Sequence, residues 1–148
     1  METYELIRKL GMLSNKVDNL YAQYAKSQSI NYNTLAVLYV AYMNKEFTQT
    51  QVCDMWVRHK QTIHTVCKEL ERKGYIAMQK GEADRREMTM RLTESGRKYA
   101  APIVERLILM ETEVFKKMGE ASCLAMIKEN KAFCDFLQEE IEKYGGTA

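Results

Sequence analysis

The spacing of apolar residues changes twice along this 148-residue chain, from helical to alternating and back to helical. In the first part, apolar side chains recur every three or four positions from Leu6 to Tyr24, which predicts an amphipathic helix of about five turns. Asn31 or Asn33 can cap a second helix. The chain is therefore expected to begin with two consecutive helices.

Two shorter helices are predicted next. Thr48 can cap a short helix with the sequence TQTQVCDMW, and a polar stretch at 58–60 leads into another helical pattern. That pattern ends in ERKG, with basic residues in its last turn and Gly74 directly after its cap. Its apolar positions share one side of the helix: Ile63, Val66, Cys67 and Leu70.

The apolar period then becomes two. YIAMQK and EMTMRLT alternate on either side of GEADRR, so residues 75–93 are predicted to form a two-stranded hairpin with a charged tip. Thr93 or Ser95 begins a long helix that includes Pro102, which should kink it or mark its first turns, and Ser122 can cap a last helix. Short helices followed by a β-hairpin make a winged helix-turn-helix. The predicted fold class is mainly α with a small β-hairpin wing.

The long helices at both ends carry apolar stripes that a domain of this size cannot cover by itself. A symmetric dimer is the commonest way to bury such surfaces. We therefore expect a homodimer.

Composition excludes several classes of protein. Hydrophobic residues make up 46% and charged residues 28% of the chain, which is typical of a globular domain and argues against disorder. No apolar run approaches the ~18 residues that a membrane span needs, and the charged N-terminus does not resemble a signal peptide. We expect a cytoplasmic protein that is not inserted in a membrane.

The net charge of +2 conceals an uneven distribution. Residues 57–98 hold eleven Lys and Arg against six Asp and Glu, an excess of +5, while the rest of the chain sums to −3. A local basic excess is typical of a nucleic-acid-binding surface and slightly favours that interpretation over the alternative, a solvated surface of mixed charge.

The sequence offers little for catalysis or metal binding. There is no CxxC pair, Gly-rich phosphate loop, GxSxG or HExxH, and His64 with Cys67 supplies only two of the ligands that a zinc site needs. We predict no metal, no cofactor and no enzymatic activity. The cysteines are too few and too scattered for a secreted disulfide framework: Cys53, Cys67, Cys123 and Cys134.

Three stretches together resemble the multiple-antibiotic-resistance regulator (MarR) family of bacterial transcription factors: TQTQVCDMW, KQTIHTVCKELERKGYI and ADRREMTMRLTESGR. The resemblance implies a single MarR-like domain over residues 1–148. Within it, residues 31–93 would form the winged helix-turn-helix lobe that binds DNA, and residues 1–30 and 94–148 the dimerisation helices. The implied function is that of a sequence-specific homodimeric repressor on a palindromic operator in double-stranded DNA.

The residues of the second short helix suit a recognition helix in the major groove, because Gln pairs with adenine, Thr contacts thymine methyl groups and Lys contacts guanine or phosphate. Its candidate DNA contacts are Lys60, Gln61, Thr62, His64, Thr65 and Lys68. Thr48 and Gln49 can contact phosphate from the preceding helix, although Thr48 also serves as a simple cap.

The paired arginines at the hairpin tip have a role in this interpretation. Arg85 or Arg86 would enter the minor groove, which attracts arginine where it is narrow, while the other contacts phosphate. Asp84 would hold an arginine in place, or it serves only the turn. By the family pattern, Asp84 and Arg86 form the stronger pair.

The resemblance also implies regulation, because family members commonly release DNA when a small aromatic or anionic effector binds between the dimer helices and the lobe. Aromatic residues with polar tips could line such a crevice, or they pack the junction; they are Tyr21, Tyr24, Tyr39 and Trp56. Oxidation of a cysteine is the alternative signal, and Cys123 near a helix start is its best candidate. A winged-helix module that binds an acidic protein is the alternative to DNA binding.

Overall fold

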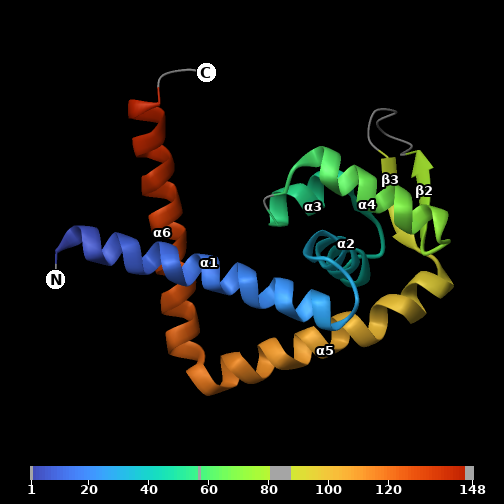
Figure 1. Ribbon diagram of the computed structural model, residues 1–148, viewed down its shortest axis with the longest axis horizontal. Helices are drawn as coiled ribbons and strands as arrows, with labels where there is room; N and C mark the ends of the chain where they lie inside the picture. The colour runs from blue at the N-terminus through green and yellow to red at the C-terminus, as the bar shows by residue number, and fades with distance from the viewer. Residues whose placement is uncertain (1, 57, 81–87, 146–148) are drawn as a thin grey trace. The chain divides into compact units, whose positions relative to one another are not determined.

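The computed structural model describes residues 2–56, 58–80 and 88–145, and the chain forms two compact units, residues 1–105 and 106–148 (Figure 1). Helix α5 (Glu94–Met118) contributes to both units. The other elements of the first unit are α1 (Thr3–Ser27), α2 (Tyr32–Met43), β1 (Phe47–Thr48), α3 (Gln49–Trp56), α4 (Lys60–Arg72), β2 (Ile76–Lys80) and β3 (Met88–Leu92). Helix α6 (Glu120–Tyr144) completes the second unit. The single-domain assignment of the whole chain stays a prediction.

Helix α2 forms the centre of the first unit. It is apolar on nearly all sides, as a helix surrounded by other elements must be. Helices α1, α3 and α4 and strand β3 all contact it (Figure 1). Its fully buried residues are Leu35, Ala36, Val37, Leu38, Val40 and Ala41.

The predicted helix ends are formed by local hydrogen bonds. The Asn31 side chain accepts from the backbone N–H of Thr34 at 2.8 Å and caps α2. After α4, Gly74 has a φ of +76°, and the N–H of Tyr75 donates to the carbonyl of Leu70 at 2.9 Å. This is the Schellman arrangement that the sequence ERKG predicts.

The hairpin is confirmed, but it belongs to a three-stranded antiparallel sheet in the order β1-β3-β2. Met90 of β3 lies opposite both Phe47 and Met78 and is buried. Strand β1 has only two residues, which is too short for an alternating pattern to predict. Its pairing fixes the start of α3 against the wing strands.

The two last helices begin differently. Thr93 caps α5, because its Oγ1 accepts from the N–H of Gly96 at 3.0 Å. Pro102 lies inside α5 and does not end it. The expectation that Ser122 caps α6 is wrong: the N-cap is Gly119, whose φ of +81° is unfavourable for residues with a side chain, and Ser122 lies in the first turn.

Each unit exposes apolar side chains on its long helices. In the first unit they lie on α1, and Leu13 is 61% exposed. In the second unit they lie on both α5 and α6, and Leu137 is 47% exposed. Even so, no helix within the described residues combines the length and apolar content that crossing a bilayer requires.

Candidate nucleic-acid interface

Helix α4 separates its residues into two faces, as predicted. Ile63, Val66, Cys67 and Leu70 are buried against the core. The six residues of α4 that are predicted to contact DNA are all exposed on the other face: Lys60, Gln61, Thr62, His64, Thr65 and Lys68. The fold therefore holds α4 by its apolar side and leaves a polar side for a partner.

The N-terminus of α4 is open to a partner. Its N-cap is His59, which has extended backbone angles and makes no side-chain capping hydrogen bond. The next residues, Lys60 and Gln61, are exposed. The first turn of a helix carries unpaired N–H groups and the positive end of the helix dipole, so this end attracts phosphate.

Helix α3 presents its own N-terminus beside α4. Thr48 caps it, with its Oγ1 accepting from the N–H of Gln51 at 3.2 Å, and the Gln51 side chain accepts from the N–H of Thr48 at 2.8 Å. This reciprocal capping box is readable from the spacing TxxQ. Gln49, the first residue of α3, places its Nε2 3.2 Å from Nδ1 of His64 on α4. Two residues predicted separately as DNA contacts are thus in direct contact.

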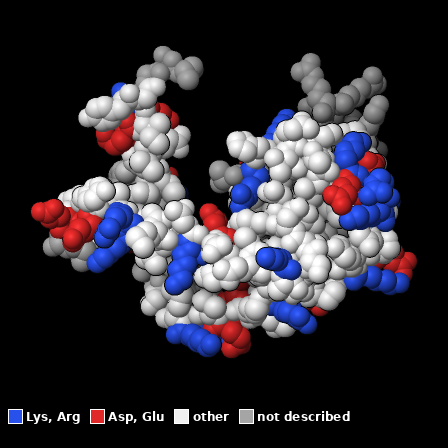
Figure 2. All heavy atoms as spheres, in the orientation of Figure 1, with Lys and Arg blue, Asp and Glu red and all other residues white. Residues whose placement is uncertain are grey.

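Charges around α4 are mixed. Lys68 pairs with Glu71 at 3.3 Å and Lys73 with Glu69 at 2.8 Å. The hydrogen bond between Lys73 and Glu69 favours the charged form of both groups. It therefore lowers the pKa of the Glu69 carboxyl and raises the pKa of Lys73. Figure 2 shows Lys and Arg with some carboxylates among them where Figure 1 draws α4 and the wing strands.

The wing tip falls outside the described residues. Asp84, Arg85 and Arg86 belong to it, so their roles stay predictions. The base of the wing is described: β2 and β3 pair from Ile76 opposite Leu92 to Lys80 opposite Met88. The register of the strands that carry the tip is therefore defined.

Three of the four predicted effector residues form one aromatic cluster with Tyr32. The ring centroid of Trp56 lies 6.1 Å from Tyr21, 5.4 Å from Tyr32 and 5.7 Å from Tyr39. The hydroxyl of Tyr24, the fourth residue, donates to the backbone carbonyl of Ile103 at 2.6 Å. The aromatic residues of α1 and α2 thus make two kinds of contact: ring contacts with Trp56 and a hydrogen bond to α5.

Arg58 was not predicted for this cluster but belongs to it. Its guanidinium lies 4.3 Å from the centre of the Tyr32 ring, a cation–π contact. Burial is the main cause that raises the pKa of the Tyr32 hydroxyl. The Nε of Arg58 and the Nε1 of Trp56 are both buried without a hydrogen-bond partner. Such donors are costly to bury unpaired, and an acceptor beside them would be stabilised.

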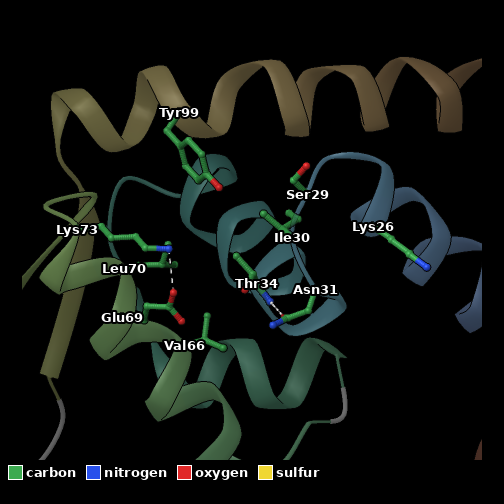
Figure 3. A pocket seen from close by; sticks show the side chains of 10 residues that line it. All are labelled: Lys26, Ser29, Ile30, Asn31, Thr34, Val66, Glu69, Leu70, Lys73 and Tyr99. Carbon is green, nitrogen blue, oxygen red and sulfur yellow. Dashed lines mark hydrogen bonds and ion pairs between the residues drawn. The ribbon is translucent and has the colours of Figure 1, made fainter.

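A polar cavity of about 320 Å³ lies elsewhere in the first unit, among α1, α2, α4 and α5 (Figure 3). The Tyr99 hydroxyl points into it, and the Lys73–Glu69 ion pair forms part of its wall (Figure 3). The side chain of Lys26 points away from these groups (Figure 3). Lys73 in this wall is thus already paired with a carboxylate.

The cysteines differ in exposure. Cys67 is buried, and burial raises the pKa of its thiol to about 12, which keeps it protonated and unreactive. Cys123 is also buried, with its thiol 3.7 Å from the carbonyl oxygen of Phe115, so it lacks the exposure that a reactive thiol needs. Cys53 is half-buried, and Cys134 is exposed. Among the described residues, no group of three His, Cys, Asp or Glu is placed to hold a metal.

Comparison with known proteins places this geometry in a family. Residues 30–96 match a winged helix DNA-binding domain. NMB1585, a MarR family regulator from Neisseria meningitidis, is 32% identical, with a TM-score of 0.85 over 93% of this chain and 97% of that protein. Streptococcus pneumoniae FabT, solved in complex with DNA, is 23% identical, with a TM-score of 0.67 over 93% and 99% of the two chains, and shares the fold.

A curated relative gives a weaker match. The DNA-binding transcriptional repressor ScoC of Bacillus subtilis is 25% identical over 119 residues, which cover 78% of this chain and 59% of ScoC. The chain spans about half the length of the curated relatives it matches. These relatives are regulators rather than enzymes. With the winged helix match and the 32% identity to NMB1585, the chain belongs to the MarR family of regulators.

Proposed function

We propose that this protein is a sequence-specific, DNA-binding transcriptional repressor that acts as a homodimer. The observation that carries the proposal is α4, which is anchored by buried apolar residues and has an exposed polar face and an open N-terminus. A helix of this kind enters the major groove and reads base edges with the residues near its start. Because its partner would be chromosomal DNA, we expect it to act in the cytoplasm.

The proposed contacts divide by role. Gln61, Thr62, His64 and Thr65 face the bases, while Lys60 and Lys68 supply charge to phosphates. Thr48 and Gln49 extend the contact from the start of α3. Asp84, Arg85 and Arg86 at the wing tip are proposed to reach the minor groove.

The exposed apolar helices support the dimer. Leu13 and Val17 on α1 are more than half exposed, as are Leu124 and Ile141 on α6. Contiguous apolar surface on long helices is costly in water and usually marks an interface. A second copy of the chain would bury it and present two recognition helices to a palindromic operator.

Relatives support both repression and DNA binding. ScoC is a repressor, and FabT and reduced AbfR have been solved on DNA. We extend repression and DNA binding from these proteins to this chain.

A small aromatic or anionic effector is proposed to release the DNA. The candidate site is the cluster of Tyr21, Tyr39 and Trp56, with Tyr24 nearby in sequence. Its support is that two donors beside these rings, Trp56 Nε1 and Arg58 Nε, are buried without a partner, and a carboxylate is a strong acceptor for such groups. BpsR of Bordetella bronchiseptica, which shares this fold, is regulated by 6-hydroxynicotinic acid, so that acid is a sensible first probe.

Selection from a random duplex library at near-physiological salt tests the DNA-binding proposal. Enrichment of a palindrome with half-sites about one helical turn apart would support a dimeric regulator. Binding that is uniform across sequences and lost with added salt would favour the alternative of a winged-helix module for an acidic protein. Release of the operator by peroxide, but not by aromatic acids, would favour cysteine oxidation, with exposed Cys134 as the first residue to replace.

A further inference from the structure

We propose that Gln49 is a positioning residue that holds His64 as a hydrogen-bond donor toward the bases and thereby sets a base preference in the operator. The inference rests on the proposed DNA-binding function and adds to it an interaction between α3 and α4 that affects which base is preferred. It starts from one contact, in which Gln49 Nε2 lies 3.2 Å from His64 Nδ1.

The backbone next to Gln49 is fixed by hydrogen bonds. Gln49 follows Thr48, which pairs with Thr89 in the wing sheet and closes the capping box with Gln51. Gln49 itself is half-buried, while His64 is exposed. The backbone that carries Gln49 is therefore held beside α4, and its half-buried side chain meets the exposed side chain of His64.

The chemistry of the contact determines where the imidazole proton lies. With the amide nitrogen of Gln49 toward the ring, Nδ1 of His64 accepts, and the proton of the neutral ring is then on Nε2. The outer nitrogen of His64 is thereby fixed as a donor. An exposed histidine without such a partner can carry the proton on either nitrogen and can present a donor or an acceptor.

A fixed donor discriminates among bases in the major groove. Guanine O6 and N7, adenine N7 and thymine O4 accept hydrogen bonds there, whereas cytosine presents its N4 amino group as a donor. His64 held by Gln49 should therefore favour a purine or thymine at the position it reads and disfavour cytosine. Loss of Gln49 should relax that preference without removing His64.

The first arm of the test needs no DNA. Long-range ¹H–¹⁵N spectra at about pH 8.5, where histidine is ordinarily neutral, distinguish the two tautomers of His64. The wild type should show Nε2–H alone, and Gln49→Met, which keeps the chain length but removes the donor, should show a mixture of tautomers, as expected for exposed His59. Gln79→Met is the control: it makes the same substitution at an exposed residue of β2 and should leave the His64 signals unchanged.

The second arm measures binding to the selected operator and to duplexes changed at single positions. At one base pair in each half-site, the wild type should prefer purine or thymine over cytosine by about 3- to 10-fold, the size of one hydrogen bond. Both Gln49→Met and His64→Ala should lose this preference. The double variant should discriminate between the bases as well as His64→Ala alone, because both substitutions remove the same interaction, the donor of His64 held by Gln49.

Two results would overturn the proposal while leaving the regulator function intact: unchanged His64 tautomer signals in Gln49→Met, or a base preference that survives this substitution. A wild-type protein that binds all duplexes equally would instead overturn the proposed sequence-specific function, and the base preference with it. The tautomer spectra separate these cases, because they report on Gln49 and His64 in the free protein.

Discussion

Gly96 marks the place where α5 approaches the turn after α4 most closely, and replacing it tests how the wing base is held. A Cβ built at Gly96 would lie 1.9 Å from the carbonyl oxygen of Tyr75 and 2.7 Å from its carbonyl carbon. Both atoms belong to the backbone, so no side chain can rotate away. The glycine of the motif LTxxG is thus required by this contact between α5 and the start of the wing.

The cost of Gly96→Ala follows from the hydrogen bonds around it. The Cβ and the oxygen would have to separate by about 1.5 Å to reach the 3.4 Å of ordinary contact. Three bonds span the same junction: Thr93 N–H to Tyr75 O at 3.0 Å, Thr93 Oγ1 to Gly74 O at 2.6 Å and Ser95 Oγ to Gly74 O at 3.0 Å. Stretching each one by that distance breaks it, and at about 1 kcal/mol per bond the loss is about 3 kcal/mol.

Urea unfolding followed by circular dichroism measures this loss as a change in the free energy of unfolding. Gly11→Ala is the matched control, because a Cβ there meets no heavy atom of the described chain within 4 Å. Since Gly11 lies within helix α1, that change should stabilise the protein by about 0.5–1 kcal/mol. If Gly96→Ala proved as stable as the wild type, the close approach of α5 to Tyr75 would be refuted.

Four further predictions concern the wing, the dimer, a helix cap and a thiol. Arg86→Ala should weaken operator binding by about 1–3 kcal/mol in fluorescence anisotropy, and unchanged affinity with an intact fold would count against the wing contact. Leu137→Asp should yield monomers in light scattering and abolish binding to a two-half-site operator, whereas a dimeric, DNA-competent variant would place the interface elsewhere. Thr48→Ala should lower the free energy of unfolding by about 1 kcal/mol, since Oγ1 loses its bond to the first turn of α3; no change in urea unfolding would contradict the capping role. Because burial raises the pKa of Cys67 to about 12, it should react with a disulfide reagent far more slowly than exposed Cys134 in the native protein, and equal rates would contradict its burial.

The sequence predicted features that depend on local pattern. The apolar period of α4 identified its buried face, and the change to a period of two identified the wing strands. Caps such as Asn31 and the Gly74 ending were also predicted, because they need only a few neighbouring residues. The error at Ser122 has a local cause as well: the preceding Gly119 already ends the turn and starts α6.

Contacts between distant segments could not be predicted in this way. Strand β1 is a strand only because Phe47 and Thr48 pair with β3, about forty residues later in the chain. Arg58 joins the aromatic cluster through Tyr32 of α2, and the hydroxyl of Tyr24 reaches Ile103 of α5. A pattern of residue types carries no information about such partners.

The amino-acid sequence by itself thus determined the order of the helices and of the two wing strands, the two faces of α4 and the resemblance to the family, because periodicity, caps and motif spacing are properties of neighbouring residues. Only the tertiary structure decided which of those residues act together. Gln49 meets His64 because the wing sheet and a capping box fix the start of α3 beside α4. Gly96 is required because α5 returns to the backbone of Tyr75. Both depend on the packing of segments far apart in the chain, and that packing is decided by the whole core.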